Sequence, residues 1–259
     1  MKILAILFLT TFATQSFQAS ANSNFYIENQ SIKSSQIETK TIALEHFDGI
    51  ASDMVFDVEV VKSNEEKVVI KSNYLQFVEV NVKNSVLKIA YKRGQSLENV
   101  DTKIVVYAKD IKFVSSGIGS IVKIKDDFDI QKFSTVSGGK IYGDSNAKKV
   151  TINTESGSLV SGTINTENLV LNSKSASTID IQGKISKAII NSEQASKIIA
   201  IKANITTALV DARSASSVSV SVSKELTASA NSLAKIRYKK LSLIKFSASR
   251  ESGGTIDSI

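Results

Sequence analysis

The segment Ser173–Ile179 reads SKSASTI, and Ser192–Ile198, which begins 19 residues later, reads SEQASKI. Both run through small residues and one variable residue to a terminal Ile, and this motif recurs eight times at spacings of 18 to 20 residues. Two positions before its end the residue is always Gly, Ser or Ala. The terminal residues are Ile121, Ile141, Val160, Ile179, Ile198, Val218, Ile236 and Ile256. A fixed period of this length is typical of one supersecondary unit stacked on itself.

Aligning the copies on their terminal residue shows which positions face a core. Eight positions before the end every copy has an apolar residue: Phe113, Phe133, Ile152, Leu171, Ile190, Val210, Ala228 and Ala248. β-branched residues dominate, and no segment shows a sustained helical period. Each unit should therefore contain one strand, a turn and a second strand, with helix nearly absent. We predict an all-β chain in which residues 111–259 form a right-handed parallel β-helix, a solenoid with about 19–20 residues per rung.

Two polar columns run beside the apolar one. Seven positions before the end stand Asn153, Asn172, Asn191 and Asp211, and five positions before it stand Glu155, Lys174, Glu193 and Arg213. Equivalent residues of neighbouring rungs lie roughly 4.8 Å apart, so stacked amides can hydrogen-bond and alternating charges attract one another. We expect both columns to be structural ladders. The Asn residues are expected at a corner of the coil, because Asn tolerates a left-handed backbone.

The run of small residues has its own explanation. Where the chain turns with backbone close to backbone, side chains longer than those of Ala or Ser would crowd the corner. Ile118 and Leu233 break this rule. Their presence predicts a rung that is locally wider or bulged at each position.

The N-terminal half differs from the repeats. Residues 22–40 are polar and rich in Ser, Asn and Gln, as expected of a lead-in segment. Residues 41–110 contain short segments of alternating apolar residues, such as Met54–Val61 and Val86–Tyr91, which are separated by turn residues. We expect this strand-rich front to form a small sheet, compatible with antiparallel pairing, that begins the stack.

Residues 1–21 read as a secretory signal peptide. Lys2 is the charged region, Ile3–Ala13 is a mostly apolar stretch, and Ala19-Ser20-Ala21 supplies the small residues that precede cleavage. An uncleaved anchor is the alternative, but the apolar stretch is shorter than a membrane-spanning helix requires. We expect export, with a mature chain that begins near Asn22 and resides in the periplasm, at the outer surface or in the medium.

Composition limits the available chemistry and the partners. The chain has no Cys, which excludes disulfides, thiolate metal sites and lipidation at a cysteine. It carries a formal net charge of +7, and Trp is absent. Because aromatic residues are not interleaved with basic ones, we expect no nucleic-acid binding. A basic cluster near the end is a candidate anion-binding patch for glycan or peripheral membrane contact, or alternatively a solvated face: Lys235, Arg237, Lys239, Lys240, Lys245 and Arg250.

Three features together resemble a known family. Phe47-Asp48-Gly49-Ile50, the segment Val86–Ile89 and the later small-residue repeats ending in Ile resemble the head-GIN domain family of bacterial exported proteins, which are labelled as auto-transporter adhesins. The resemblance covers about residues 45–257 and implies a β-helical fold. It brings no catalytic residues that can be placed on this sequence.

Few residues are candidates for catalysis or metal binding. His46 is the only histidine, which argues against a His-centred triad or a multi-His metal site. The segment Asp126–Asp129 groups three carboxylates that could bind Ca²⁺, but their spacing lacks the pattern of a calcium loop. Glu155 and Glu193 should lie two rungs apart, roughly 9.6 Å, with Lys174 between them. That distance is at the outer limit for an inverting glycosidase pair, so we assign no catalytic, cofactor-binding or metal-binding residue.

These observations favour a non-enzymatic exported module of the adhesion type that presents flat solenoid faces to a glycan or an envelope protein. Two alternatives remain open at this point. One is a polysaccharide-cleaving β-helix enzyme, and the other is a structural envelope protein whose solenoids associate end to end through an uncapped last rung.

Overall fold

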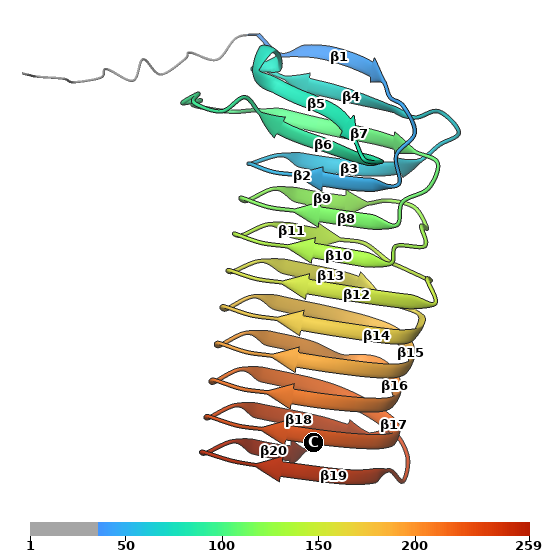
Figure 1. Ribbon diagram of the computed structural model, residues 1–259, viewed down its shortest axis with the longest axis vertical. Helices are drawn as coiled ribbons and strands as arrows, with labels where there is room; N and C mark the ends of the chain where they lie inside the picture. The colour runs from blue at the N-terminus through green and yellow to red at the C-terminus, as the bar shows by residue number, and fades with distance from the viewer. Residues whose placement is uncertain (1–35) are drawn as a thin grey trace, which may run out of the picture. The chain divides into compact units, whose positions relative to one another are not determined.

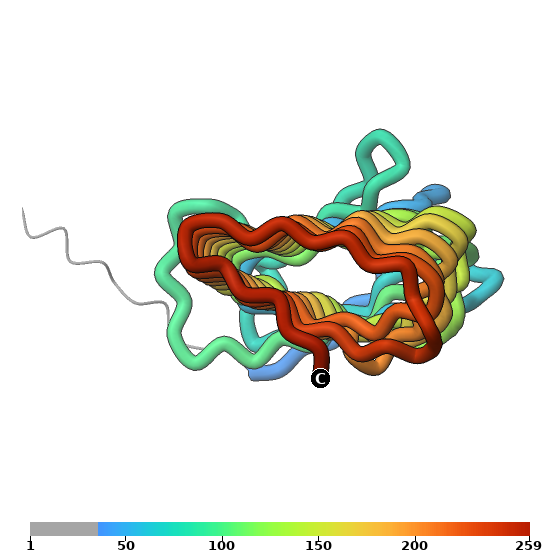
Figure 2. Tube along the Cα trace, turned by 90° about the horizontal axis from the view of Figure 1, so that it is seen from below, coloured from blue at the N-terminus to red at the C-terminus, as the bar shows by residue number. Residues whose placement is uncertain are grey.

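The computed structural model describes residues 36–259, which form a stack of flattened rungs. The expected signal peptide (1–21) and most of the polar lead-in (22–40) lie outside the described residues. Each rung contributes one strand to a face that we call face A and a second strand to a face that we call face B (Figure 1). Figure 2 shows the two faces enclosing a narrow interior along the whole stack.

Face A is nearer to the viewer in Figure 1, and its strands follow one another in parallel along the repeats. Its separate strands are β2 (Gly49–Ser52), β5 (Val78–Lys83), β6 (Val86–Tyr91), β8 (Phe113–Ser116), β10 (Lys132–Thr135), β12 (Lys149–Thr154), β14 (Thr166–Ser173) and β19 (Lys245–Arg250).

Face B lies behind face A in Figure 1 and is also parallel along the repeats. Its separate strands are β1 (Glu38–Ala43), β3 (Asp57–Lys62), β4 (Lys67–Ser72), β7 (Thr102–Ala108), β9 (Ile121–Ile124), β11 (Lys140–Tyr142), β13 (Leu159–Thr163), β18 (Lys235–Lys240) and β20 (Thr255–Ser258).

Three long strands cross from face B to face A: β15 (Thr178–Ser192), β16 (Lys197–Ala212) and β17 (Ser217–Ala230). The only helical segment among residues 36–259 is the short 3-10 turn η1 (Leu75–Phe77). As the chain descends in Figure 1, face-A strands run from right to left and face-B strands return from left to right, so the coil is right-handed. The predicted right-handed parallel β-solenoid is confirmed. In this part of the chain no helix is long and apolar enough to cross a membrane.

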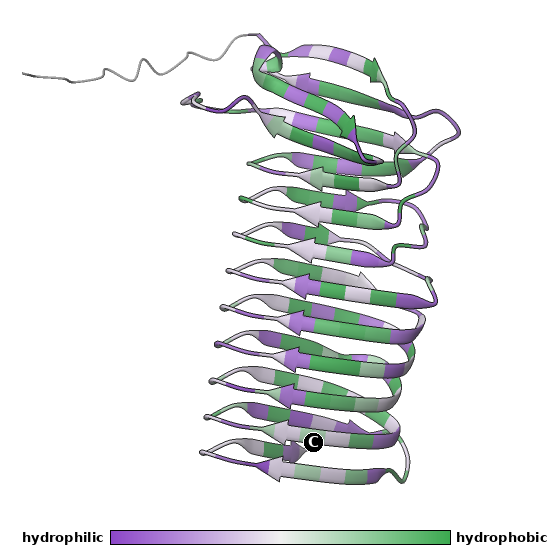
Figure 3. Ribbon diagram, viewed as in Figure 1, coloured by the Kyte–Doolittle hydropathy of each residue, from purple (hydrophilic) through white to green (hydrophobic). Residues whose placement is uncertain are grey.

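The core consists of inward residues from both faces. Val150 and Ile152 of face A and Val160 of face B are fully buried, and equivalent positions repeat in the neighbouring rungs. Figure 3 shows the resulting alternation of hydrophobic and hydrophilic residues along the strands. Each such side chain contributes about 1.5–3 kcal/mol through burial, which is the main stabilisation available to a chain without disulfides.

A four-residue turn forms the tight corner of every repeat, at the left in Figure 1. In the fourth copy, Ser175 and Ala176 have φ values of 52° and 59°, and the Ser177 N–H donates to the Lys174 carbonyl at 3.2 Å. Two successive left-handed residues closed by this hydrogen bond are typical of a type I′ turn. The turns also stack, because the Ala176 N–H donates to the Gln194 carbonyl of the next rung at 2.9 Å.

The structure corrects the alignment of the first repeat by one residue. Ile141 pairs with Val122 rather than with Ile121, and Phe133 pairs with Val114 rather than with Phe113. Val122 and Val114 are fully buried, whereas Ile121 is only half-buried. Since both members of each pair are apolar, alternation alone did not decide which one faces inward.

Ile118 and Leu233 do not widen their rungs, contrary to the sequence-based expectation. They occupy left-handed positions of the turn, with φ values of 46° and 63°, and their side chains are 57% and 72% exposed. The ladder irregularities lie elsewhere, in the pairings of β16 with β15 and β17. Small residues are therefore required only where the side chain would point into the corner, whereas the side chains of Ile118 and Leu233 point to solvent.

The strand-rich front supplies a cap and two rungs. β2 and β3 form one rung, and the later strands β6 and β7 form another that lies on one side of it, while β8 and β9 lie on the other side. Antiparallel pairing, with which the sequence of the front is compatible, occurs between β1 and β4, between β4 and β7, and between β5 and β6. β2 and β3 themselves pair in parallel with their neighbours.

Candidate binding groove and polar columns

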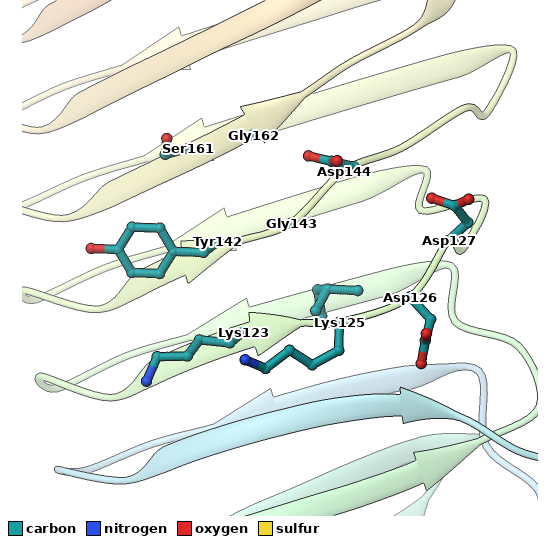
Figure 4. Close-up of a pocket in the computed structure, with 10 residues that line it drawn as sticks. Lys123, Lys125, Asp126, Asp127, Tyr142, Gly143, Asp144, Ser161 and Gly162 are labelled. Atoms are coloured by element: carbon teal, nitrogen blue, oxygen red, sulfur yellow. The ribbon is translucent and has the colours of Figure 1, made fainter.

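Two adjoining hollows on face B form one polar groove, which we call the Tyr142 groove (Figure 4). Their volumes are about 510 and 290 Å³, and both are lined by Asp144, Ser161 and Gly162. The first hollow extends to Lys123–Asp127 and Tyr142, and the second to Asp180, Gln182 and Lys202. The groove therefore spans several consecutive rungs near the ends of the face-B strands.

Register explains why these residues meet. Lys123, Tyr142, Ser161 and Asp180 are successive partners in the parallel ladder, so they form one outward column. Thr163 and Gln182 belong to the next outward column, and the Gln182 Nε2 group donates to Thr163 Oγ1 at 3.2 Å. Rigid β-strands thus hold the polar groups before any ligand arrives, which lowers the entropy cost of binding.

Two glycines of the groove lie where neighbouring rungs approach closely. A Cβ atom on Gly143 would lie 2.6 Å from Ile124 Cγ1, and one on Gly162 would lie 1.9 Å from the Gly143 carbonyl oxygen. Both separations are shorter than an ordinary van der Waals contact between these atoms. The approach of the Gly143 backbone therefore requires glycine at position 162, whereas a side chain at position 143 would have to displace the Ile124 side chain.

Ion pairs balance much of the charge at one end of the groove. Lys123 Nζ lies 2.9 Å from Asp57 Oδ2, and Lys125 Nζ lies 3.1 Å from Glu59 Oε1. The Asp144 Oδ1 atom accepts a hydrogen bond from the Thr163 N–H at 2.6 Å, which fixes that carboxylate. In Figure 4 the Tyr142 ring projects outward beside the lysines, while Asp126 and Asp127 lie at the loop end.

Lys62 contacts the start of the segment Asp126–Asp129. Asp126 Oδ2 accepts the Lys62 N–H at 2.7 Å, and Lys62 Nζ donates to the Asp127 carbonyl at 3.0 Å. Phe128 is buried beneath Lys62. Within residues 36–259 no group of three or more His, Cys, Asp or Glu side chains is arranged to hold a metal ion.

The Asn column is hydrogen-bonded along the stack. Asn172 Nδ2 donates to Asn153 Oδ1 at 2.9 Å, and Asn191 Nδ2 donates to Asn172 Oδ1 at 2.9 Å. Asp211 follows in register after Asn191. The expectation that the Asn residues occupy a corner is wrong, because they lie in extended strands and the left-handed positions come three and four residues later, as at Ser175, Ala176 and Gln194.

The charged column contains one ion pair along the stack and one within a rung. Lys174 Nζ lies 3.6 Å from Glu193 Oε2. Arg213 instead turns to Asp211 in the neighbouring column, with Nε to Oδ1 at 3.0 Å and Nη2 to Oδ2 at 2.5 Å. The hydrogen bonds and charge of Asp211 raise the pKa of the Arg213 guanidinium. Glu155 lines a separate hollow of about 370 Å³ beside this column.

The six basic residues near the end do not form one compact patch. Lys235, Arg237, Lys239 and Lys240 belong to β18 on face B, whereas Lys245 and Arg250 belong to β19 on face A. Lys245 pairs with Glu225 at 3.2 Å, and the Arg250 Nη2 group donates to the Ile256 carbonyl at 2.9 Å. All six are exposed.

His46, the lone histidine, lies in the cap region. Its Nδ1 atom is 2.9 Å from Glu66 Oε1, and Lys109 Nζ is 3.9 Å from the other oxygen of that carboxylate. The side chain of Glu66 is almost fully buried. His46 thus has a structural partner in Glu66.

The Tyr142 groove was not predicted from the sequence, because the aligned columns lie before the terminal Ile or Val of each motif, whereas the groove residues lie after it. The outward positions after it carry Tyr142, Ser161 and Asp180, which share polarity but not residue type. Extending the alignment one and three positions past the motif would have grouped these residues with Asp144 and Gln182.

The comparisons with known proteins agree with this architecture. A family model described as "Putative auto-transporter adhesin, head GIN domain" matches residues 46–241, most of the chain. The chain belongs to this family. None of the curated proteins matches the sequence.

Solved structures show the same fold at low sequence identity. A "putative lipid binding protein" from Parabacteroides distasonis is 20% identical, with a TM-score of 0.73 over 86% of this chain and 96% of that one. A "putative adhesin" from Parabacteroides merdae is 17% identical, with the same TM-score and coverage. A "putative adhesin" from Bacteroides fragilis is 17% identical, with a TM-score of 0.63 over 87% and 98%. The family and these neighbours carry names of adhesins and a lipid-binding protein rather than enzymes.

Proposed function

We propose that this head GIN protein is an exported, non-enzymatic binding module and that the Tyr142 groove binds a glycan. The observation that carries the proposal is an exposed aromatic ring next to prearranged polar groups on consecutive rungs. Family membership supports an adhesion-type role. The secretory signal read in residues 1–21 supports export to the periplasm, the surface or the medium.

The chemistry of the groove suits a polyhydroxylated ligand. A sugar ring presents apolar C–H groups on one side, which can pack on the Tyr142 ring, and hydroxyl groups at its edge. Those hydroxyls can donate to Asp144 and Asp180 and accept from Gln182 and Lys202. Ligand sites generally combine a hollow of 300–1,000 Å³ with a few well-placed polar groups, and the two hollows together fall in that range.

A glycan array probed with the mature chain tests the proposal. Binding should be lost or weakened at least about tenfold in Tyr142→Ala and in Asp144→Ala, because each removes a direct contact. Tyr107→Ala is the matched control, since Tyr107 is a half-buried tyrosine of β7 on the same face, outside the groove. An array without binding, or binding unaffected by the groove variants, would contradict glycan recognition here and point to a protein or envelope-lipid partner.

The competing hypothesis is polysaccharide cleavage by the Glu155 and Glu193 column. Lys174 stands between these carboxylates in the stack and pairs with Glu193, which favours a structural role. Cleavage would release reducing ends from acidic polysaccharides, and Glu155→Gln or Glu193→Gln would abolish that release. A structural column predicts no release in any of the proteins and only a small change in stability.

A further inference from the structure

An apolar column runs along the outer side of face A. Val170, Ile189 and Leu209 are successive partners in the parallel ladder, and Thr151 and Thr227 continue the column at its two ends. Ile189 is 46% exposed and Leu209 is 50% exposed. A shallow groove of about 700 Å³ lies over the column. Figure 3 shows face A at its most hydrophobic in these middle rungs.

Two outward columns flank it, and their charges are related rung by rung. The column directly beside it on one side is Lys149, Asn168, Lys187 and Thr207. On its other side the Asn column comes next, and beyond that lie Glu155, Lys174, Glu193 and Arg213. In these four rungs, Lys on the first side is matched by Glu on the second, and a neutral residue on the first side is matched by a cation on the second. The fifth rung carries Glu225 on the first side and the neutral Asn231 on the second.

This relation between the columns has no cause within one chain. Alternation inside each column avoids stacking like charges 4.8 Å apart, and that needs no second column. The two columns are six residues apart on each strand, about 20 Å, which exceeds side-chain contact and the screening length at physiological salt. A surface that meets both columns at once would explain why their signs are matched.

We propose that face A is the interface of a homodimer in which two copies pack face to face about a two-fold axis parallel to the long axis of the stack. This rotation keeps each rung at its own height and exchanges the two flanks. With the axis between the apolar column and the Asn column, Lys149 and Lys187 lie opposite Glu155 and Glu193 of the second copy, and each apolar column packs against the Asn column, next to the apolar column of the other copy. The same contacts form twice, as a two-fold interface requires.

The charges select this orientation over the inverted one. A two-fold axis running along the strands and centred on Ile189 would place Lys187 against Lys187 and Glu193 against Glu193 of the other copy. Like charges facing one another at an interface are unfavourable. The parallel arrangement contains none of these contacts.

The size of the face predicts a modest affinity. Five rungs and six residue steps cover roughly 500 Å² on each copy, or about 1,000 Å² in the dimer, at the lower end for specific interfaces. We therefore expect a dimer that dissociates on dilution. Sedimentation equilibrium over a range of concentrations measures this directly.

Cysteine cross-linking tests the geometry, because the chain contains no native Cys. In the parallel dimer, Val170→Cys, Ile189→Cys and Leu209→Cys should each cross-link to the same residue of the second copy with a short bis-maleimide. Lys197→Cys, exposed on face B, is the control and should not cross-link. Cross-linking of Ile189→Cys alone would overturn the parallel orientation.

A charge exchange tests the flanking columns. Glu193 already pairs with Lys174, so the exchange is best made at Lys149 and Glu155. Lys149→Glu should weaken dimerisation about tenfold, and the double variant Lys149→Glu/Glu155→Lys should recover it. Failure of the double variant to recover, with thermal stability intact, would overturn the proposed contact.

Ile189→Lys supplies a folded monomer, because this side chain is exposed and leaves the core unchanged. A native protein that stays monomeric at every concentration would overturn the dimer. A second result would also overturn the dimer: the native protein binds a fluorescent fatty acid as a monomer, and Ile189→Lys loses that binding. The apolar column would then bind an amphiphile instead of a second copy.

Discussion

Asn172 occupies the middle of the amide ladder, where it donates to Asn153 and accepts from Asn191. Asn172→Ala removes both hydrogen bonds, whereas Asn153→Ala removes only one. A typical hydrogen bond contributes about 0.5–1.5 kcal/mol net, so we expect losses in the free energy of unfolding of about 2 and about 1 kcal/mol. Both substitutions replace Asn by Ala in a strand of face A, so their intrinsic strand preferences cancel in the comparison.

Urea unfolding followed by far-ultraviolet circular dichroism measures the two losses. The midpoint should shift roughly twice as far for Asn172→Ala as for Asn153→Ala, at an unchanged slope. Ser229→Ala, in the same column beyond the amides, is the control and should change the midpoint little. Equal shifts for the two Asn variants would refute the ladder as a stabilising chain of hydrogen bonds and would leave water as the effective partner.

Three further outcomes are expected. Ser177→Val should lower the free energy of unfolding by about 2–4 kcal/mol, because the buried Ser177 hydroxyl accepts from the Lys174 N–H and donates to the Thr154 carbonyl. Calorimetry measures this loss, and a much smaller loss would contradict a stabilising role of the hydroxyl. Leu233→Gly should raise the melting temperature slightly by relieving a left-handed φ, and a lower value would contradict that. Burial raises the pKa of the Tyr91 phenol above that of an exposed tyrosine. The free energy of unfolding, measured by urea unfolding at a series of pH values, should therefore fall as the pH rises above about 10, and less steeply in Tyr91→Phe.

The repeats were predictable because each column returns the same chemistry at nearly the same interval. Stacked Asn153, Asn172 and Asn191 fixed the register independently of hydrophobicity. The pattern failed where two residues were chemically equivalent, as with Ile121 and Val122, since only packing distinguishes them. The sequence indicates only that residue 177 is small. It does not predict that the buried Ser177 hydroxyl donates a hydrogen bond to the preceding rung, because such bonds have no local sequence signal.

The front of the chain and the groove were less predictable for different reasons. Alternation identified the strands, but nothing local indicates that β6 and β7 stack on one side of β2 and β3 while β8 stacks on the other. The Tyr142 groove depends on outward residues from consecutive rungs, and such positions are free to differ in type. Their proximity arises from the stacking order and cannot be read from any single repeat.

The position of the β2–β3 rung between a later rung and the repeats gives the stack a direction. Residues 49–62 template parallel neighbours on both sides, but the side carrying β6 and β7 ends in the antiparallel strands β1, β4 and β5. Antiparallel strands present a different hydrogen-bond pattern from the parallel edge that a further rung requires. Duplication of a 19-residue unit can therefore lengthen the solenoid among its repeats without disturbing the opposite end, so the family can vary in length while its front stays constant.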